Sequence, residues 1–348
     1  MSGHDITDEN LESLSLETDR RSFIKLALGA LALGAASYTG IRSFLKPSQI
    51  PGLVEGASFK RGHTLLTGGF KIPGKKMSSK VVIVGAGMAG LHAGWWLKRN
   101  GFEDFIILEL EDEVGGKSRY KTNKSSESPL GAHYLPLPNK EAFHTIELLK
   151  EMGVLTQESA NGNVFKEDYL SFAPRERLFI HGRWQEGIVP NNGIGPSQKK
   201  QMEKFFSIME KYKWSKGKDG KFAFSIPMDL SSRDSKFLSL DKITMKDWMK
   251  AEGLSNEYLD WYVNYCTLDD FGTPFDQTSA WAGIHYFAGR RGKNKDSDED
   301  MVLTWPEGNG RIVKHLRSKL EGHIQTGKIV KKIKSSKNQV FVLVDDQA

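Results

Sequence analysis

The segment from Lys80 to Glu109 constrains the fold of this chain more than any other. It opens with a β-branched run, 81–84, of the kind that forms a parallel strand covered on both faces. A glycine-rich stretch, 85–90, follows, and the apolar periodicity of 91–99 predicts a helix. A second apolar run, 105–108, predicts another buried strand. Strand, helix and strand within about thirty residues predict a βαβ unit with a parallel sheet.

The glycine-rich stretch has the spacing G-x-G-x-x-G. It consists of Gly85, Ala86, Gly87, Met88, Ala89 and Gly90. The first glycine permits a tight turn, the second lets the backbone approach a pyrophosphate on the helix N-terminus, and the third allows the helix to pack closely on the strand. Glu109 ends the second strand, where a carboxylate accepts hydrogen bonds from ribose hydroxyls and its charge disfavours a 2′-phosphate. The segment therefore predicts a dinucleotide site that does not take NADP.

Composition sets limits on the rest of the chain. Its 348 residues are 39% hydrophobic, enough for about two domains with sizeable cores. The net charge is +6, and the densest basic stretch, 328–337, alternates with apolar residues, as in a solvated strand face rather than a nucleic-acid patch. Cys266 is the sole cysteine, which excludes an intrachain disulfide and a multi-cysteine metal site, so no metal is expected.

Residues 109–119 decide which dinucleotide is expected. They resemble the E-x-x-x-x-x-G-G-R segment of flavin amine oxidases, phytoene desaturases and protoporphyrinogen oxidases, with Gly115-Gly116 as the glycine pair. The resemblance implies FAD as cofactor, with this pair close to its phosphates and ribityl chain. Two positions depart from the family, since Lys117 and Glu111 stand where it has arginines; Arg119 lies nearby. A lysine meets phosphate as a point charge without bidentate geometry.

Three further segments carry the same resemblance. Gly131-Ala132-His133 matches the family segment that lies along the isoalloxazine ring. A histidine in such a turn is more often packed or hydrogen-bonded than active on substrate, and both interpretations of His133 stay open. The turn 306–311 resembles the one that re-enters the cofactor domain, and Val330 matches the valine whose backbone meets the adenine.

The predicted architecture is α/β, a Rossmann-like FAD-binding domain interrupted by a helix-rich substrate domain. The predicted segments are a twin-arginine signal peptide (1–45), a linker or N-terminal arm (46–79), the first portion of the FAD-binding domain (80–155), the substrate domain (156–300) and an incomplete second portion of the FAD-binding domain (301–348). Helices are expected near 140–153 and from 196, over 244–252, 255–266, 278–287 and 311–320, and a hairpin over 178–184.

The N-terminal segment predicts export. Arg20-Arg21 precedes an uncharged run, 26–41, which is shorter than the about 20 apolar residues of a membrane-spanning helix. The segment resembles the twin-arginine motif, and Gly34-Ala35-Ala36 offers a cleavage site. We expect the export machinery as a partner and a periplasmic location, with a retained anchor or a helix packed on the protein as alternatives.

Aromatic residues recur at helical spacing in the middle region. Tyr258, Trp261, Tyr262 and Tyr265 fall at i, i+3, i+4 and i+7. Trp281 and His285 form a second pair at i and i+4. An aromatic cage for an amine and a stripe facing the core both fit, and the core stripe is the commoner structure.

The resemblance implies hydride transfer from an amine, or a related substrate such as a polyene, to the flavin. A nicotinamide-dependent dehydrogenase and a non-catalytic flavin-fold protein are the alternatives. The family's lysine near the flavin would lie beyond Ala348, so no catalytic residue is assigned. Because the chain stops directly after the strand-like run 340–344, we expect it to be incomplete, and residues 1–348 alone to express poorly or bind FAD weakly. The oligomeric state and the electron acceptor stay open.

Overall fold

The computed structural model describes residues 52, 55–67, 74, 76–159, 162–171, 176–295 and 301–346. It divides the chain into two units at Glu55/Gly56, and the features below belong to the second unit. The predicted signal, including Arg20-Arg21, lies outside the described residues. Within the described portion of the chain, no helix has the length and apolar character needed to cross a membrane.

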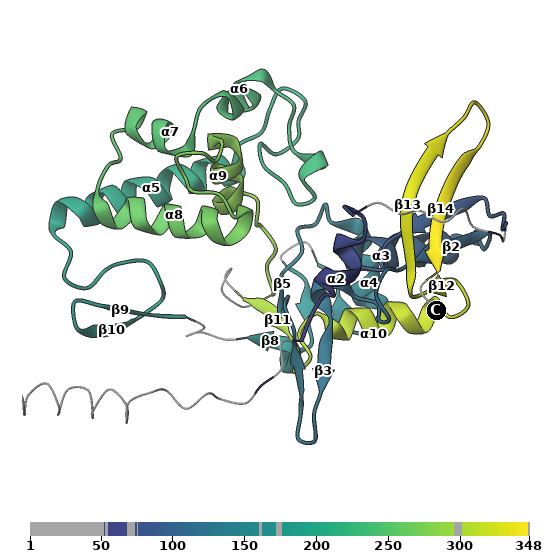
Figure 1. Ribbon diagram of the computed structural model, residues 1–348. Helices are drawn as coiled ribbons and strands as arrows, with labels where there is room; N and C mark the ends of the chain where they lie inside the picture. Colours follow the sequence, from purple (N-terminus) through teal and green to yellow (C-terminus); the bar gives the residue numbers. More distant parts are fainter. Residues whose placement is uncertain are drawn as a thin grey trace, which may run out of the picture. The chain divides into compact units, whose positions relative to one another are not determined.

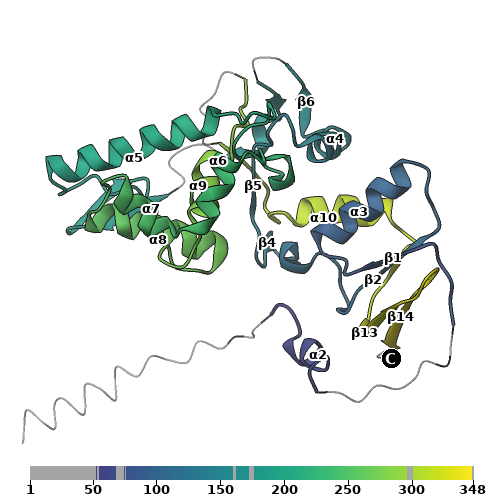
Figure 2. The ribbon, with the colours of Figure 1, turned by 90° about the horizontal axis from the view of Figure 1, so that it is seen from above.

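The predicted βαβ unit is present. Strands β1 (Val81–Val84) and β2 (Phe105–Leu108) pair in parallel, with helix α3 (Met88–Arg99) between them in sequence. Strand β12 (Ile324–Gln325) pairs in parallel with the other edge of β2, and helix α10 (Gly310–Lys319) leads into it. Helices α3 and α10 lie side by side (Figures 1 and 2). The α/β class is therefore confirmed, and one parallel sheet combines strands from residues 81–108 with a strand from residues 324–325.

A first hydrophobic cluster surrounds this sheet. It draws on residues 86–170 and 303–320, with Leu91, Ile107 and Leu316 fully buried. The expectation that β1 is covered on both faces is wrong at its end, where Val84 is 51% exposed. That residue directly precedes the glycine turn, so its side chain borders the edge of the sheet where the turn begins.

Several short strands form separate small sheets in addition to the parallel sheet. Strands β5 (Tyr134–Pro136), β11 (Val302–Thr304) and β8 (Leu170–Ser171) form an antiparallel sheet in the order β5-β11-β8. The other short elements are the pairs β3 (Tyr120–Thr122) with β4 (Glu127–Pro129) and β6 (Leu155–Gln157) with β7 (Val164–Phe165), and helix α4 (Phe143–Glu151). Strands β5 and β8 precede the helical middle region in the sequence, and β11 follows it. The chain therefore returns to the first cluster after residue 301.

The predicted basic strand is the hairpin of β13 (Lys328–Ser335) and β14 (Val340–Asp346), paired antiparallel with an irregularity between Val330 and Lys332. Lys332 and Lys334 are exposed, which confirms the solvated face. Ile333 and Phe341 are also exposed, so the hairpin carries apolar side chains on its surface.

The middle region is rich in helices, as predicted. It contains the hairpin of β9 (Arg177–Ile180) and β10 (Arg183–Glu186), then α5 (Pro196–Trp214), α6 (Ser235–Leu238), α7 (Met245–Ala251), α8 (Glu257–Phe271) and α9 (Ala280–Ala288). A second hydrophobic cluster over residues 202–288 holds these helices together. The first and second clusters are thus separate hydrophobic cores, and the predicted domains with their boundaries stay a prediction.

Helix α8 differs from its predicted bounds at both ends. The cap is Asn256, whose Oδ1 accepts hydrogen bonds from Tyr258 N and Leu259 N at 3.1 and 3.0 Å, and not Ser255. The helix continues past Cys266 to Phe271 and ends at Gly272, which has a left-handed φ of +62°. An asparagine carbonyl reaching two N–H groups fixes the start, and a glycine free to adopt positive φ fixes the end.

The aromatic stripe of α8 divides between core and surface. Tyr262 is 8% exposed and belongs to the second cluster, and Tyr258 packs against it. Trp261 and Tyr265 are 44% and 41% exposed and stack on each other with ring centroids 5.9 Å apart. The core-stripe interpretation is confirmed for Tyr262 and wrong for the stacked pair. Cys266 is buried, and burial raises the pKa of its thiol to about 11.

One predicted linker contains structure. Within the 46–79 segment, helix α2 (Phe59–His63) forms, capped by the Ser58 hydroxyl accepting from Arg61 N at 3.3 Å. The segment predicted to be a linker or N-terminal arm therefore contains one short helix.

Candidate cofactor-binding site

The turn from β1 to α3 requires glycine at two positions. Gly85 has a φ of +94°, a conformation that residues with a side chain rarely adopt. A Cβ on Gly90 would lie 1.9 Å from the Gly85 carbonyl oxygen, so the helix could not approach the strand as closely. The packing role predicted for the third glycine of the motif is thus visible in the geometry.

Gly87 has a different reason to be glycine. Its φ of −71° suits any residue, and no described atom lies within 4 Å of a Cβ built there. Gly87 is also the N-cap of α3, and no side chain among the described residues caps this end. The first N–H groups of a helix lack partners within it and favour an anion. The space beside Gly87 is therefore suited to the pyrophosphate that the motif predicts.

Glu109 ties the end of β2 to the glycine turn. Its side chain is nearly buried; Oε2 accepts from Ala86 N at 2.6 Å, and Oε1 accepts from Glu111 N at 2.9 Å. Each carboxylate oxygen retains acceptor capacity for a further donor such as a ribose hydroxyl. The sequence predicted only that Glu109 binds the ribose. It did not predict that Glu109 also stabilises the glycine turn through its hydrogen bond with Ala86 N.

The glycine pair lies against the glycine turn. Gly115 has a φ of +111°, donates from its N to Ala86 O at 2.8 Å and forms a parallel bridge with Gly87. Gly116 has a φ of +54°, and a Cβ there would lie 3.3 Å from Gly87 Cα. Because both positions are left-handed and close to Gly87, the two glycine segments form one backbone-lined cradle.

Arg119 brings a partly buried guanidinium group to this region. Its side chain is 12% exposed, and its Nε is buried with no hydrogen-bond partner among the described residues. One guanidinium nitrogen lies 3.9 Å from Glu111 Oε2. A buried donor without an acceptor is uncommon in proteins, and a phosphate supplies the planar pairing that guanidinium favours. The donor set therefore fits FAD.

Lys117 contributes through its main chain. Its carbonyl oxygen accepts from Ala132 N at 2.9 Å, and a Cβ on Gly131 would lie 2.5 Å from the same oxygen. The side chain of Lys117 is exposed. The segments 115–119 and 131–133 are thereby brought together.

His133 is exposed and makes local contacts. Its Nδ1 lies 3.3 Å from Gly131 O, and its carbonyl oxygen accepts from Thr304 Oγ1 at 2.9 Å. Gly308, with a φ of +58°, could not carry a Cβ, since it would lie 2.7 Å from His133 Cα. The ring of His133 thus has one local contact, with Gly131, and both interpretations of this residue stay open. The turn 306–311 packs against the main chain of His133.

Val330 lies on β13, shortly after residues that bond to the main chain of Glu109 and Glu111. Glu109 N donates to Gln325 O at 2.8 Å, and Lys328 N donates to Glu109 O at 2.7 Å. Gly327 N donates to Glu111 O at 2.9 Å. The chain from β12 into β13 therefore runs along the residues that follow β2, and Val330 comes two residues later.

Two polar residues of the 306–311 turn, Asn309 and the buried Glu307, were not predicted as site residues from the sequence. Asn309 donates from Nδ2 to Tyr134 O at 3.0 Å, while its Oδ1 is buried with no partner among the described residues. Glu307 is 3% exposed and pairs with Lys314 at 3.3 Å. Their position beside Gly308 and Gly310 is the sequence signal that could have identified them.

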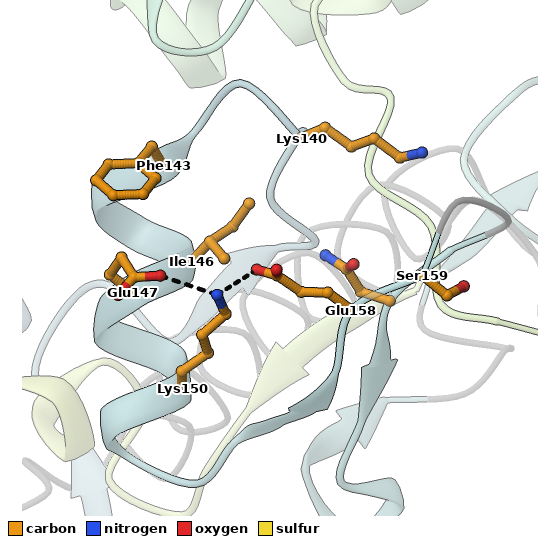
Figure 3. Close-up of a pocket in the computed structure, with 8 residues that line it drawn as sticks. Lys140, Phe143, Ile146, Glu147, Lys150, Glu158 and Ser159 are labelled. Atoms are coloured by element: carbon orange, nitrogen blue, oxygen red, sulfur yellow. Dashed lines mark hydrogen bonds and ion pairs between the residues drawn. The ribbon is translucent and has the colours of Figure 1, made fainter.

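A separate hollow of about 460 Å³ lies beside α4 (Figure 3). Among its lining residues, Lys150 Nζ pairs with Glu147 at 2.8 Å and with Glu158 at 2.6 Å. These hydrogen bonds raise the pKa of Lys150, and the same lysine lowers the pKa of Glu147. None of the predicted site residues lines this hollow, and three of its charged residues, Lys150, Glu147 and Glu158, pair with one another.

Comparison with known proteins gives the same family as the sequence resemblance. The profile of the family described as flavin containing amine oxidoreductase matches residues 88–348. Polyamine oxidase 1 of Zea mays is 25% identical over 290 residues, covering 77% of this chain and 50% of the maize protein. Tryptophan 2-monooxygenase of Allorhizobium ampelinum is 33% identical over 101 residues, covering 28% of this chain and 13% of its own.

Solved structures show the same fold. Putrescine oxidase bound to putrescine matches with a TM-score of 0.54 at 19% identity, covering 77% of this chain and 55% of its own. Cyclohexylamine oxidase from Brevibacterium oxydans matches with a TM-score of 0.53 at 16% identity, covering 78% and 56%. The chain thus spans about half the length of these relatives. It belongs to the flavin-containing amine oxidoreductases, and FAD is its cofactor.

Proposed function

We propose that this protein uses FAD to oxidise the C–N bond of an amine. The observation that carries the proposal is the cradle of Gly85–Gly90 and Gly115–Gly116, closed by Glu109 and by the unpartnered Nε of Arg119. When bound, FAD supplies the two-electron acceptor for a hydride from the carbon next to the amine nitrogen. The residues of the cradle hold the cofactor and fix its orientation.

An amine is favoured over a polyene as substrate. The maize relative is named a polyamine oxidase, and the two solved structures are named for putrescine and cyclohexylamine. The match to the flavin family also favours this activity over a nicotinamide-dependent dehydrogenase. The departures at Lys117 and Glu111 are the one sequence feature that favours a non-catalytic flavoprotein.

The test is to purify the native protein from the cells that produce it, to record its visible spectrum and to titrate it with FAD. We expect a flavin spectrum and one FAD per chain, followed by loss of the flavin colour when a suitable amine is added without oxygen. The panel should include putrescine, spermidine, cyclohexylamine and tryptophan, with a carotenoid precursor as the polyene control. Flavin binding without bleaching by any amine would favour the non-catalytic alternative, and a colourless protein that binds NAD would contradict the proposal.

We also propose export by the twin-arginine route, supported by Arg20-Arg21 ahead of the uncharged run 26–41. A dinucleotide needs a formed βαβ unit to bind, so loading before translocation explains the use of a route that carries folded proteins. Replacing both arginines with lysine should leave the protein in the cytoplasm, whereas Arg42→Lys, outside the pair, should not. Cell fractionation is the measurement, and periplasmic delivery of the double variant would rule this route out.

A further inference from the structure

Residues 58–64 of the N-terminal arm contact Glu111, which lies two residues after Glu109, the acid predicted to bind the ribose. Ser58 N donates to Glu111 Oε1 at 2.7 Å, and Arg61 forms an ion pair with Asp112 at 2.8 Å. Glu111 N in turn donates to Glu109 Oε1 at 2.9 Å. One residue therefore connects the arm to the carboxylate predicted to hold the adenosine ribose.

Residues 58–64 are attached a second time, through Thr64 and Lys331. Lys331 Nζ donates to Thr64 O at 2.9 Å and to Thr64 Oγ1 at 3.0 Å. Lys331 directly follows Val330, the residue predicted to meet the adenine. Two contacts, separate in sequence, thus hold residues 58–64 next to both protein segments that are expected to bind adenosine.

Glu111 also connects the arm with the predicted phosphate ligand. One of its carboxylate oxygens accepts from Ser58 N, and the other lies 3.9 Å from Arg119. The side chain of Glu111 is 16% exposed. An arginine at this position, as in the resembling family, would have no acceptor to offer Ser58 N–H. The departure at Glu111 is therefore explained by a contact with the arm.

We propose that residues 58–64 form one wall of the FAD site at its adenosine end, anchored by Glu111 and Lys331. This inference rests on the proposed function, because it takes FAD as the ligand of the cradle. In the bound protein the arm restricts escape of the adenosine half and keeps Glu111 oriented toward Arg119. The affinity for FAD thereby depends on a segment outside the predicted FAD-binding domain.

The test compares matched variants in equilibrium titrations with FAD and with ADP. Ser58→Pro removes the N–H donor to Glu111, and Ser58→Ala retains it while removing the hydroxyl. Lys331→Met removes the second anchor, and Lys332→Met alters an exposed lysine on the same strand. We expect Ser58→Pro and Lys331→Met each to raise the Kd for both ligands by about tenfold, the effect of one hydrogen bond involving a charged group. Lys332→Met should stay within about twofold of the wild type. Ser58→Ala keeps the N–H donor but loses the hydroxyl that caps α2, so it should bind both ligands more tightly than Ser58→Pro, which loses both groups.

Two further readouts make the test decisive. Urea unfolding of each variant shows whether the cradle itself is intact, and FAD should slow tryptic cleavage after Arg61 in the wild type but not in Lys331→Met. Unchanged affinity and unchanged protection in folded variants would overturn the inference and leave the proposed function standing. Failure of the wild type to bind FAD would overturn the proposed function and this inference with it.

Discussion

Gly90→Ala is expected to lower the free energy of unfolding by about 2–3 kcal/mol, the usual cost of forcing an extra methyl into a packed site. The new Cβ would lie 1.9 Å from the Gly85 carbonyl oxygen, so α3 must move away from β1. The gain in helix propensity from glycine to alanine, about 1 kcal/mol, is smaller than this cost. Urea unfolding followed by circular dichroism measures the difference.

Gly87→Ala is the matched control, three residues earlier in the same turn. No described atom lies within 4 Å of the added methyl, and the backbone of Gly87 suits any residue, so stability should match the wild type. FAD affinity should nevertheless fall by more than about tenfold, because the methyl occupies the space through which the backbone approaches the pyrophosphate. Wild-type affinity in Gly87→Ala would show that the pyrophosphate does not lie at this turn.

Glu109→Ala is expected to weaken FAD binding by about 1–3 kcal/mol, the cost of leaving buried hydrogen-bonding groups without partners. The same change leaves Ala86 N and Glu111 N without their acceptor, so stability should fall as well. Glu109→Gln, which keeps the size and one carbonyl oxygen, should lose less of both. FAD titration by fluorescence and urea unfolding separate the two effects; an FAD affinity equal to that of the wild type in Glu109→Ala would show that the acid does not hold the ribose.

The first strands could be predicted because their sequence is locally unambiguous. The runs 81–84 and 105–108 form strands with the predicted bounds, since β-branched and apolar residues in a row suit a buried sheet and glycine or polar residues flank each run. Helix α5 likewise begins at Pro196, a residue favoured in the first turn of a helix. Local preference and tertiary packing agree at these positions.

Helix α2 could not be predicted for the opposite reason. A helix of five residues, Phe59–His63, is too short to be stable by itself, so its sequence carries little helical signal. It is held by Glu111, Asp112 and Lys331, which are distant in the sequence. Only contacts formed in the folded protein define it.

The candidate site was predictable where the chemistry demands a residue type. The glycines of 85–90 and 115–116, with Glu109, follow from the spacing of the motif and come together in the structure. The second role of Glu109 and the unpartnered Nε of Arg119 depend on how separate segments meet in space. A single sequence does not contain that information.

The place of β12 in the parallel sheet also sets the order in which the protein can assemble during synthesis. Ile107 of β2 pairs with Ile324 of β12, so the ribosome must complete almost the whole described chain before this edge of the sheet can close. Closing so long a loop is slow, because contacts between distant residues form only after a large loss of chain entropy. Until then, the main-chain groups of β2 on this side have no strand to pair with. We therefore expect the sheet that carries the glycine turn to close only after translation of residue 325.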